Sequence, residues 1–392
     1  MAAMTTYLDY NASAPLRPGV EDAVLRGLRA QGNPSSIHRS GRTVRRLFED
    51  ARESLLSSFG RSDLRLVFTS GGTEANNLAI NGAAQLGIKR ILVSAIEHPA
   101  VLQPIEQSGI PATVLKVDQS GVLDCDDLEA QLAACDEPAL VSVMSANNET
   151  GVMQPIGRIL EICRAHNALL HTDAVQCFGK ADIDNSFEHA DLIAISAHKI
   201  GGPLGVGALL FRSDLHLGAS ILGGGQELGY RSGTENVPGA LGFAEAARQC
   251  AEDVDYAPRM AALRMQLDKG LKQVSNDAVI FGEDADRLPN TVCFAEPGIA
   301  AETAVMALDL SGFAVSAGSA CSSGKVSKSH VISAMGWDDT IAGSSIRVSL
   351  GWATEEDHID RFLEAWASIR ARLLAKDVDR QRNGGVMAGS SA

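Results

Sequence analysis

The sequence predicts an α/β protein of two domains, a large one with a mostly parallel sheet covered on both faces and a smaller α+β one. The chain has 392 residues, more than the roughly 100–200 that one domain usually needs. Through its first two-thirds, short apolar runs alternate with helical patterns, which is typical of a parallel sheet between two layers of helices. This alternation ends near residue 250. We therefore place the large domain at 15–250 and the small domain at 1–14 and 251–375.

The strands of the large domain are apolar runs of the length that buried parallel strands have. They lie at Leu64–Thr69, Arg90–Ala95, Ala139–Ser145, Ala168–Thr172, Asp191–Ser196 and Val206–Phe211. Helical patterns separate them at Thr73–Leu86, from Pro99 onward and at Ile156–His166. Proline suits the first turn of a helix, because the N–H that it lacks has no partner there. Strands and helices therefore succeed one another as in βαβ units.

The second part of the chain mixes helices and strands in another way. A polar helical stretch covers Pro258–Val274, and strand candidates lie at Asn290–Phe294, Phe313–Ser316 and Ser345–Leu350. The last strong element is a helix from about Glu355 to Leu374, with its apolar residues on one face. The tail at 376–392 is polar and rich in Gly and Ser, a composition that predicts disorder.

Composition excludes several classes of function. Lys and Arg total 34 against 48 Asp and Glu, a formal net charge of −14, which is unfavourable for binding a nucleic-acid backbone. No apolar run approaches the roughly 20 residues of a membrane span, and the first residues lack the apolar stretch of a secretory signal. The 7 cysteines include no C-x-x-C pair, which fits a reducing compartment. We expect a cytoplasmic protein that binds neither nucleic acid nor a membrane.

The first candidate for chemistry is Lys199, in the segment Ser196-Ala-His-Lys-Ile-Gly-Gly202. The lysine follows a buried-looking strand and precedes a glycine turn. From the carboxyl end of a strand its amine can form a Schiff base in a crevice. A loop lysine in water is the alternative, and this segment alone favours neither.

Two further strand ends carry polar groups. Asp173 follows the apolar Ala168–Leu170, and a carboxylate there can pair with the protonated ring nitrogen of pyridoxal, although an N-cap aspartate is the more ordinary interpretation. The segment Ser70-Gly-Gly-Thr-Glu-Ala-Asn-Asn77 joins a strand to a helix. Its glycines leave helix amides free for a phosphate, and Thr73 adds a hydroxyl. It lacks the G-x-G-x-x-G fingerprint of a dinucleotide site. The three features together predict pyridoxal phosphate as the cofactor.

Several motifs make this sequence similar to a known family. They are Tyr7-Leu-Asp-Tyr-Asn-Ala12, Gly32-Asn-Pro-Ser-Ser-Ile-His38, the lysine segment, Arg231-Ser-Gly-Thr234, Ser316-Ala-Gly-Ser-Ala-Cys-Ser-Ser323 and Ser345-Ile-Arg-Val-Ser-Leu-Gly351. Over nearly its whole length the chain resembles the cysteine desulfurases of the class V aminotransferase group, which are pyridoxal-phosphate enzymes of fold type I. The resemblance implies a seven-stranded type of sheet in the large domain, a homodimer, and L-cysteine as substrate.

Cys321 indicates the reaction. It lies among glycines and serines with no packing pattern, so we expect an exposed loop from which a thiolate can attack a ligand. Cys163, Cys250 and Cys293 instead fit buried small apolar side chains. In the family that the chain resembles, this cysteine takes the sulfur of L-cysteine as a persulfide and L-alanine is released. The Ser-x-Gly-Ser-Ala-Cys form resembles the branch that serves iron–sulfur and nitrogenase cluster assembly.

The resemblance implies a set of residues that hold the cofactor: Gly72, Thr73, Asn148, Asp173, Gln176, Ser196, His198 and Lys199, with Thr234 reaching in from a second subunit. Gly72, Thr73, Ser196, His198 and Thr234 would surround the phosphate. Asn148 and Gln176 would contact the ring hydroxyl or the substrate carboxylate.

The implied catalytic residues are Lys199, Cys321 and His98, where His98 would stack on the ring and handle protons. Asn148 and Arg347 would bind the substrate, and the planar fork of arginine suits a carboxylate. Taken alone, Arg347 also fits a strand-edge charge in water, and His98 a capping or core histidine.

The implied partner is a sulfur-acceptor protein such as an iron–sulfur cluster scaffold. We expect no intrinsic metal site, and Cys321 as a transient iron–sulfur ligand together with such a scaffold. The chain departs from the family at Leu204 and Leu228, where basic residues are usual, and we expect both to affect access to the site or partner docking. Its tail does not resemble the one that binds the scaffold in other members.

Alternative functions remain open on the sequence. A selenocysteine lyase differs only in substrate preference, whereas a class V aminotransferase needs no Cys321. A binding or scaffold protein with the same fold would be expected to have lost Lys199 or Cys321. A nicotinamide dehydrogenase is disfavoured because the glycine fingerprint is absent.

Overall fold

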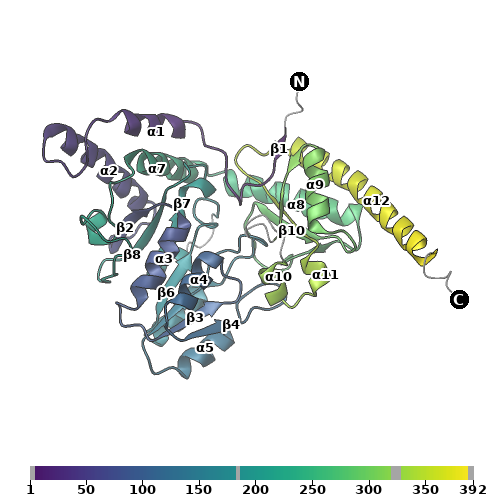
Figure 1. The fold of residues 1–392 in the computed structure, drawn as a ribbon, viewed down its shortest axis with the longest axis horizontal. Helices are drawn as coiled ribbons and strands as arrows, with labels where there is room; N and C mark the ends of the chain where they lie inside the picture. The colour runs from purple at the N-terminus through teal and green to yellow at the C-terminus, as the bar shows by residue number, and fades with distance from the viewer. Residues whose placement is uncertain (1–4, 182–185, 319–327, 387–392) are drawn as a thin grey trace.

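A computed structural model describes residues 5–181, 186–318 and 328–386. Its largest element is a seven-stranded sheet with the order β2-β8-β7-β6-β5-β3-β4 (Figure 1). The strands are β2 (Leu64–Thr69), β3 (Arg90–Ser94), β4 (Ala112–Leu115), β5 (Ala139–Ser142), β6 (Leu169–Asp173), β7 (Leu192–Ser196) and β8 (Gly207–Arg212). β8 is antiparallel to both of its neighbours, and the other neighbouring strands are parallel. The predicted mostly parallel sheet is confirmed.

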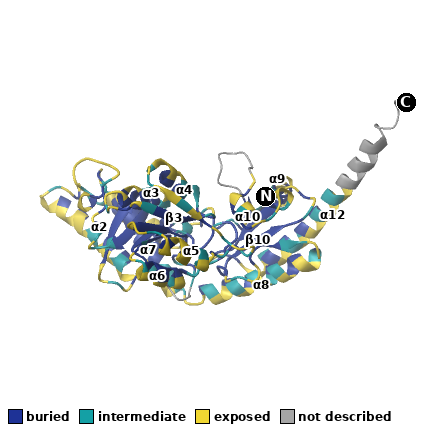
Figure 2. Cartoon of the chain, turned by 90° about the horizontal axis from the view of Figure 1, so that it is seen from below, coloured by how far each residue is buried: buried dark blue, intermediate teal, exposed yellow. Residues whose placement is uncertain are grey.

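Helices cover both faces of this sheet. One face packs against α1 (Val20–Arg29), α2 (Arg39–Ser57), α5 (Cys125–Ala133), α6 (Ile156–Ala165) and α7 (Val237–Glu252), and the other against α3 (Gly72–Ala83) and α4 (Pro99–Gln107). In β8, Leu210 belongs to the first apolar cluster and Leu209 to the second, because successive side chains of a strand point to opposite faces. Figure 2 shows these buried strands between helices whose outer surfaces are exposed.

A second, smaller sheet forms in the later part of the chain. Its order is β12 (Ser316–Ala317), β13 (Ser345–Ser349), β10 (Thr291–Ala295) and β9 (Val279–Ile280), all antiparallel, and β1 (Thr6–Tyr7) pairs separately with β11 (Phe313–Ala314). The helices around it are α8 (Tyr256–Val274), α9 (Ala301–Leu310), α10 (His330–Ala334), α11 (Asp339–Ala342) and α12 (Glu356–Val386). The fully buried Trp366 of α12 packs edge-on against Phe294 of β10, with ring centroids 5.3 Å apart.

The structure differs from the sequence-based elements in several places. The strand predicted at Phe313–Ser316 is divided, so that β11 pairs with β1 and β12 pairs with β13. α12 continues to Val386, so the backbone of residues 376–386 is helical where the sequence predicts disorder. Residues 376–383 are mainly Lys, Asp, Arg and Gln, and they include no proline, which would end a helix. The domain boundaries remain predictions. Within the described ranges no helix has the length and apolar character needed to cross a membrane.

Candidate active site

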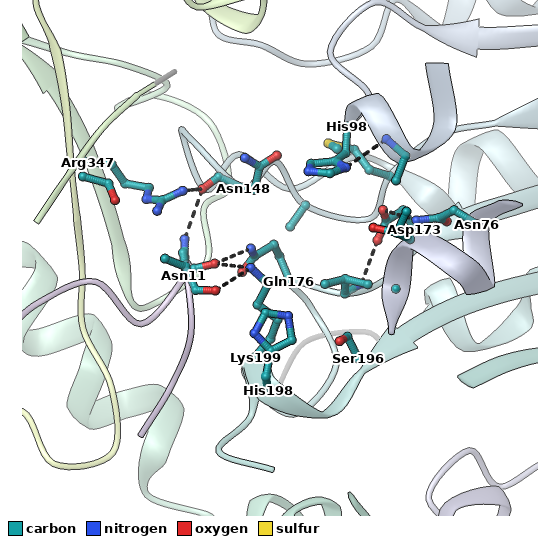
Figure 3. Close-up of a pocket in the computed structure, with 18 of the residues that line it drawn as sticks. Asn11, Asn76, His98, Asn148, Asp173, Gln176, Ser196, His198, Lys199 and Arg347 are labelled. Atoms are coloured by element: carbon teal, nitrogen blue, oxygen red, sulfur yellow. Dashed lines mark hydrogen bonds between the residues drawn. The ribbon is translucent and has the colours of Figure 1, made fainter. Parts of the chain in front are cut away.

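The carboxyl ends of β6 and β7 face a cavity of about 510 Å³ (Figure 3). It brings together ten residues singled out in the sequence: Gly72, Thr73, His98, Asn148, Asp173, Gln176, Ser196, His198, Lys199 and Arg347. All but Arg347 come from the region of the large sheet, whereas Arg347 lies in β13 of the smaller sheet. The cavity therefore lies between the two sheets, and residues far apart in the sequence meet there.

Lys199 lies in the short turn that follows β7. Its Nζ donates hydrogen bonds to the main-chain oxygens of Asn11 at 2.6 Å and Ala12 at 3.0 Å. The following Gly201 has a φ of +83°, and a Cβ there would lie 2.7 Å from Cγ of Arg17. Only glycine fits this close approach, which holds the lysine turn against the N-terminal segment. Lys199 thus lines the cavity and is not the loop lysine in water that the sequence left open.

Asp173 ends β6 and is buried. Its carboxylate accepts hydrogen bonds from Nδ2 of Asn76 at 2.7 Å and from the main-chain N–H of Val175 at 3.0 Å. Burial raises the pKa of Asp173, while His98 and the two N–H donors oppose that rise. The carboxylate therefore both caps the following turn and faces the cavity, where it can pair with a cationic ring nitrogen.

His98 begins α4 as its N-cap residue. Its Nδ1 accepts from the main-chain N–H of Ala100 at 3.0 Å. Burial lowers the pKa of His98, with Asp173 opposing that effect. The neutral ring consequently carries its proton on Nε2. The capping role proposed as an alternative is real, and the same side chain also lines the cavity.

The N-terminus of α3 and Ser196 supply polar donors to the cavity. α3 begins at Gly72, and the preceding Gly71 offers no side chain to cap the first N–H groups. A Cβ at Gly72 would lie 2.7 Å from Cγ2 of Val175, so a larger residue would fill this corner. The buried Oγ of Ser196 has no hydrogen-bond partner among the described residues. An uncapped helix N-terminus with nearby hydroxyls suits a phosphate group.

Arg347 is buried in β13, which lies between β12 and β10. It is therefore not the strand-edge charge in water that the sequence alone allows. Its Nη2 donates to Oδ1 of Asp9 at 2.8 Å, and its Nη1 donates to the main-chain oxygen of Asn148 at 3.0 Å. Asp9 in turn accepts from Oγ of Ser316 at 2.7 Å. These contacts orient the guanidinium at the cavity wall.

Sequence reasoning missed four polar residues of this cavity, Asp9, Asn11, Asn76 and Ser316. The main-chain oxygen of Asn11 accepts from Lys199 and, at 3.0 Å, from Nε2 of Gln176. Asp9 and Asn11 belong to the Tyr7–Ala12 motif, which carried no role of its own. Asn76 follows Thr73 by one helical turn, so it lies on the same face of α3. That spacing was the signal that could have found it.

One predicted site residue within the described ranges, Thr234, is exposed and does not line this cavity. Its predicted contact requires a second subunit. Cys321 lies outside the described residues. Leu204 and Leu228, the two departures from the family, are 74% and 61% exposed.

The structure describes all three cysteines that were predicted to be buried, Cys163, Cys250 and Cys293. Cys163 and Cys293 are fully buried, as predicted, whereas Cys250 is half-buried. Burial raises the pKa of Cys163 to about 12 and that of Cys250 to about 11. These thiols remain protonated at neutral pH and are poor nucleophiles.

A buried carboxyl group, Glu149, lies behind the cavity. Its Oε2 accepts from Oγ of Ser329 at 2.5 Å. Burial raises the pKa of Glu149 to about 7, with Ser329 and Arg347 opposing the rise. Because this pKa is higher in the folded than in the unfolded chain, Glu149 contributes stability below its unfolded pKa of 4.5 that is lost as pH rises towards 7.

Glu149→Gln is expected to remove this dependence, since the amide is a neutral replacement for the protonated acid. When the pH is raised from 4.5 to 8, the free energy of unfolding of the wild type should fall by about 3 kcal/mol relative to that of the variant. Urea unfolding at both pH values measures the change, with the exposed Glu106→Gln as control. An equal difference from wild type at both pH values would contradict the raised pKa.

Known proteins are similar to this chain in sequence and fold. The aminotransferase class-V family model matches residues 6–362. The cysteine desulfurase IscS of Dictyoglomus turgidum is 39% identical over 94% of this chain and 95% of that protein. A NifS-like protein from Rickettsia africae superposes with a TM-score of 0.87 at 34% identity, covering 94% of this chain and 99% of the other. A structure described as SspA in complex with cysteine has a TM-score of 0.76 at 30% identity, over 88% of this chain and 99% of the other. The chain therefore belongs to the aminotransferase class-V family, and within it to the cysteine desulfurases.

Proposed function

We propose that this protein converts L-cysteine to L-alanine and transfers the sulfur to its own Cys321. The Cβ–S bond of the substrate breaks and an S–S bond to Cys321 forms, so that cysteine and the enzyme thiol yield alanine and an enzyme persulfide. The observation that carries the proposal is the convergence of Lys199, Asp173 and the free N-terminus of α3 on one cavity. Relatives named cysteine desulfurases support the choice of substrate.

The residues of the cavity fit pyridoxal phosphate, the cofactor used by this family. Oγ of Ser196, which has no partner within the described part of the chain, and the space that a Cβ at Gly72 would fill suit the phosphate. Asp173 suits the ring nitrogen, and Lys199 offers the amine. When bound, the cofactor withdraws electrons from the substrate's Cα and so makes its proton acidic.

The protein's own residues supply binding and proton transfer. Arg347, held by Asp9 and Asn148, binds the substrate carboxylate and fixes the orientation of Cα. The Nζ of Lys199 removes the Cα proton, and Nε2 of His98 holds or returns a proton. Cys321, as thiolate, attacks the substrate sulfur.

The test is incubation of the pyridoxal-phosphate-loaded protein with L-cysteine, with assays of alanine and of protein-bound persulfide. Equal amounts of both in a single turnover would support the proposal. A keto acid formed in place of alanine would instead indicate an aminotransferase. Faster turnover of L-selenocysteine, with no persulfide from L-cysteine, would indicate a selenocysteine lyase.

Finer parts of the proposal rest on the family resemblance. They are a homodimer in which Thr234 reaches the partner's phosphate site, a cytoplasmic location, and delivery of sulfur to an iron–sulfur cluster scaffold or another acceptor. The exposed Leu204 and Leu228 bear on that docking, because apolar side chains replace the usual basic ones.

A further inference from the structure

A second lysine, Lys180, is buried behind the cavity and has no task in the proposed reaction. It lies in the turn after β6 and is 4% exposed. Its Nζ donates to Oδ1 of Asn11 at 2.9 Å and to Oε1 of Gln176 at 2.7 Å. Within the described part of the chain, both hydrogen-bond partners are neutral amides and no carboxylate pairs with this amine. Burying an amine without a counter-charge is costly, so its position calls for an explanation.

These two hydrogen bonds help to orient both amides, together with Nδ2 of Asn290, which donates to Oδ1 of Asn11 at 3.2 Å. Because Oδ1 of Asn11 accepts from Lys180, its Nδ2 is free to donate to Oγ1 of Thr291 at 2.9 Å. Because Oε1 of Gln176 accepts from Lys180, its Nε2 faces the main-chain oxygen of Asn11. That oxygen also accepts from Nζ of Lys199. Asn11 thus links the two lysines, and Figure 3 shows Asn11, Gln176 and Lys199 converging at this wall.

The two amines are also electrostatic neighbours. Lys180 and Lys199 line the same small void of about 10 Å³. Burial lowers the pKa of Lys180 well below its ordinary value, and Lys199 and Arg347 lower it further, while Cys177 and Cys250 oppose the change. Repulsion between two cations is mutual, so a protonated Lys180 also disfavours protonation of Lys199.

Other ionisable groups act on Lys199 from the surrounding elements. Asp173 of β6 attracts its positive charge, whereas His98 of α4 and His198 of the same turn are held largely neutral by burial. Lys180 differs from these groups because its amine donates to the same residue as Lys199 does, namely Asn11.

We infer that Lys180 is a positioning residue of this site: it helps to orient the amides of Asn11 and Gln176 and, in its protonated form, disfavours a second positive charge on Lys199. The inference rests on the proposed function, because an unprotonated amine is the form that reacts with the cofactor's aldehyde and accepts the substrate's proton.

The experiment compares Lys180→Met, which removes both charge and donors, with Lys180→Gln, which keeps N–H donors without the charge. The pyridoxal-phosphate-loaded proteins are titrated between pH 6 and 10, about the range of a perturbed amine, by the visible absorption of the attached cofactor, without cysteine. Both variants should raise the midpoint by about one pH unit. The exposed Lys89→Met should keep the wild-type midpoint. Unchanged midpoints in both variants would overturn the inference. A shift in Lys180→Met alone would overturn the electrostatic role, because Lys180→Gln lacks the charge as well, and would assign the effect to the hydrogen bonds.

A second measurement keeps the test independent of the cofactor. Cyanate carbamylates unprotonated amines, so the pH dependence of Lys199 carbamylation in cofactor-free protein, read by peptide mass, should shift upward in the same variants. If wild type bound no pyridoxal phosphate, the proposed function would fail while cyanate still decided the role of Lys180. If Lys180→Met did not fold, Lys180→Gln would be compared with Lys180→Arg, which keeps the cation and should keep the wild-type value.

Discussion

Lys199→Ala is expected to lower kcat/KM for L-cysteine by about 10³- to 10⁴-fold, the scale of a lost general base. The amine lies at the cavity wall, where it donates to the main-chain oxygens of Asn11 and Ala12. Its removal takes away both the attachment point of the cofactor and the base for the Cα proton. Activity is measured as alanine production, and attachment by the visible absorption of the cofactor.

Lys199→Arg separates the effect of the positive charge from that of the primary amine. A guanidinium keeps the positive charge but cannot form a Schiff base, so this variant should lose as much activity as Lys199→Ala. The exposed Lys89→Ala should behave as wild type. Substantial activity in Lys199→Arg would show that a cation suffices at this position. It would contradict the role of Lys199 in attaching the cofactor and removing the Cα proton.

Cys321→Ala is expected to abolish the protein-bound persulfide and to reduce alanine production by on the order of 10³-fold or more, as for loss of other catalytic nucleophiles. Without the thiolate, the substrate sulfur has no acceptor on the protein. The variant should still bind pyridoxal phosphate with the wild-type absorption, because the residues proposed to hold the cofactor do not include Cys321. Persulfide is followed by mass spectrometry after a single addition of L-cysteine.

Cys135→Ala is the control for that experiment, since Cys135 is half-buried and does not line the cavity. It should form persulfide at the wild-type rate. Full alanine production by Cys321→Ala would refute the persulfide mechanism, while the cofactor assignment would stand on its own spectroscopic evidence.

Much of the large sheet could be read from the sequence because its strands are buried on both faces. Such strands are continuous apolar runs, and β2, β6 and β7 were each located to within a residue or two. β4 was missed because it has only four residues and most of them are exposed or half-exposed. β2 lies at the opposite edge of the sheet and was found because five of its six residues are buried.

The two-residue strands of the smaller sheet were harder to identify. The division between β11 and β12 depends on their partners, β1 and β13, which lie far away in the sequence. Strands of only two residues carry almost no periodicity of their own.

The sequence by itself determined the chemistry: which lysine, carboxylate and thiol are available, and the glycine turns that place the first two at strand ends. Only the tertiary structure decided how those groups are supported. Arg347 meets Asp9, and Lys180 meets Asn11, across separations of 338 and 169 residues. No local pattern encodes such contacts, because their partners are brought together by the packing of the two sheets around one cavity.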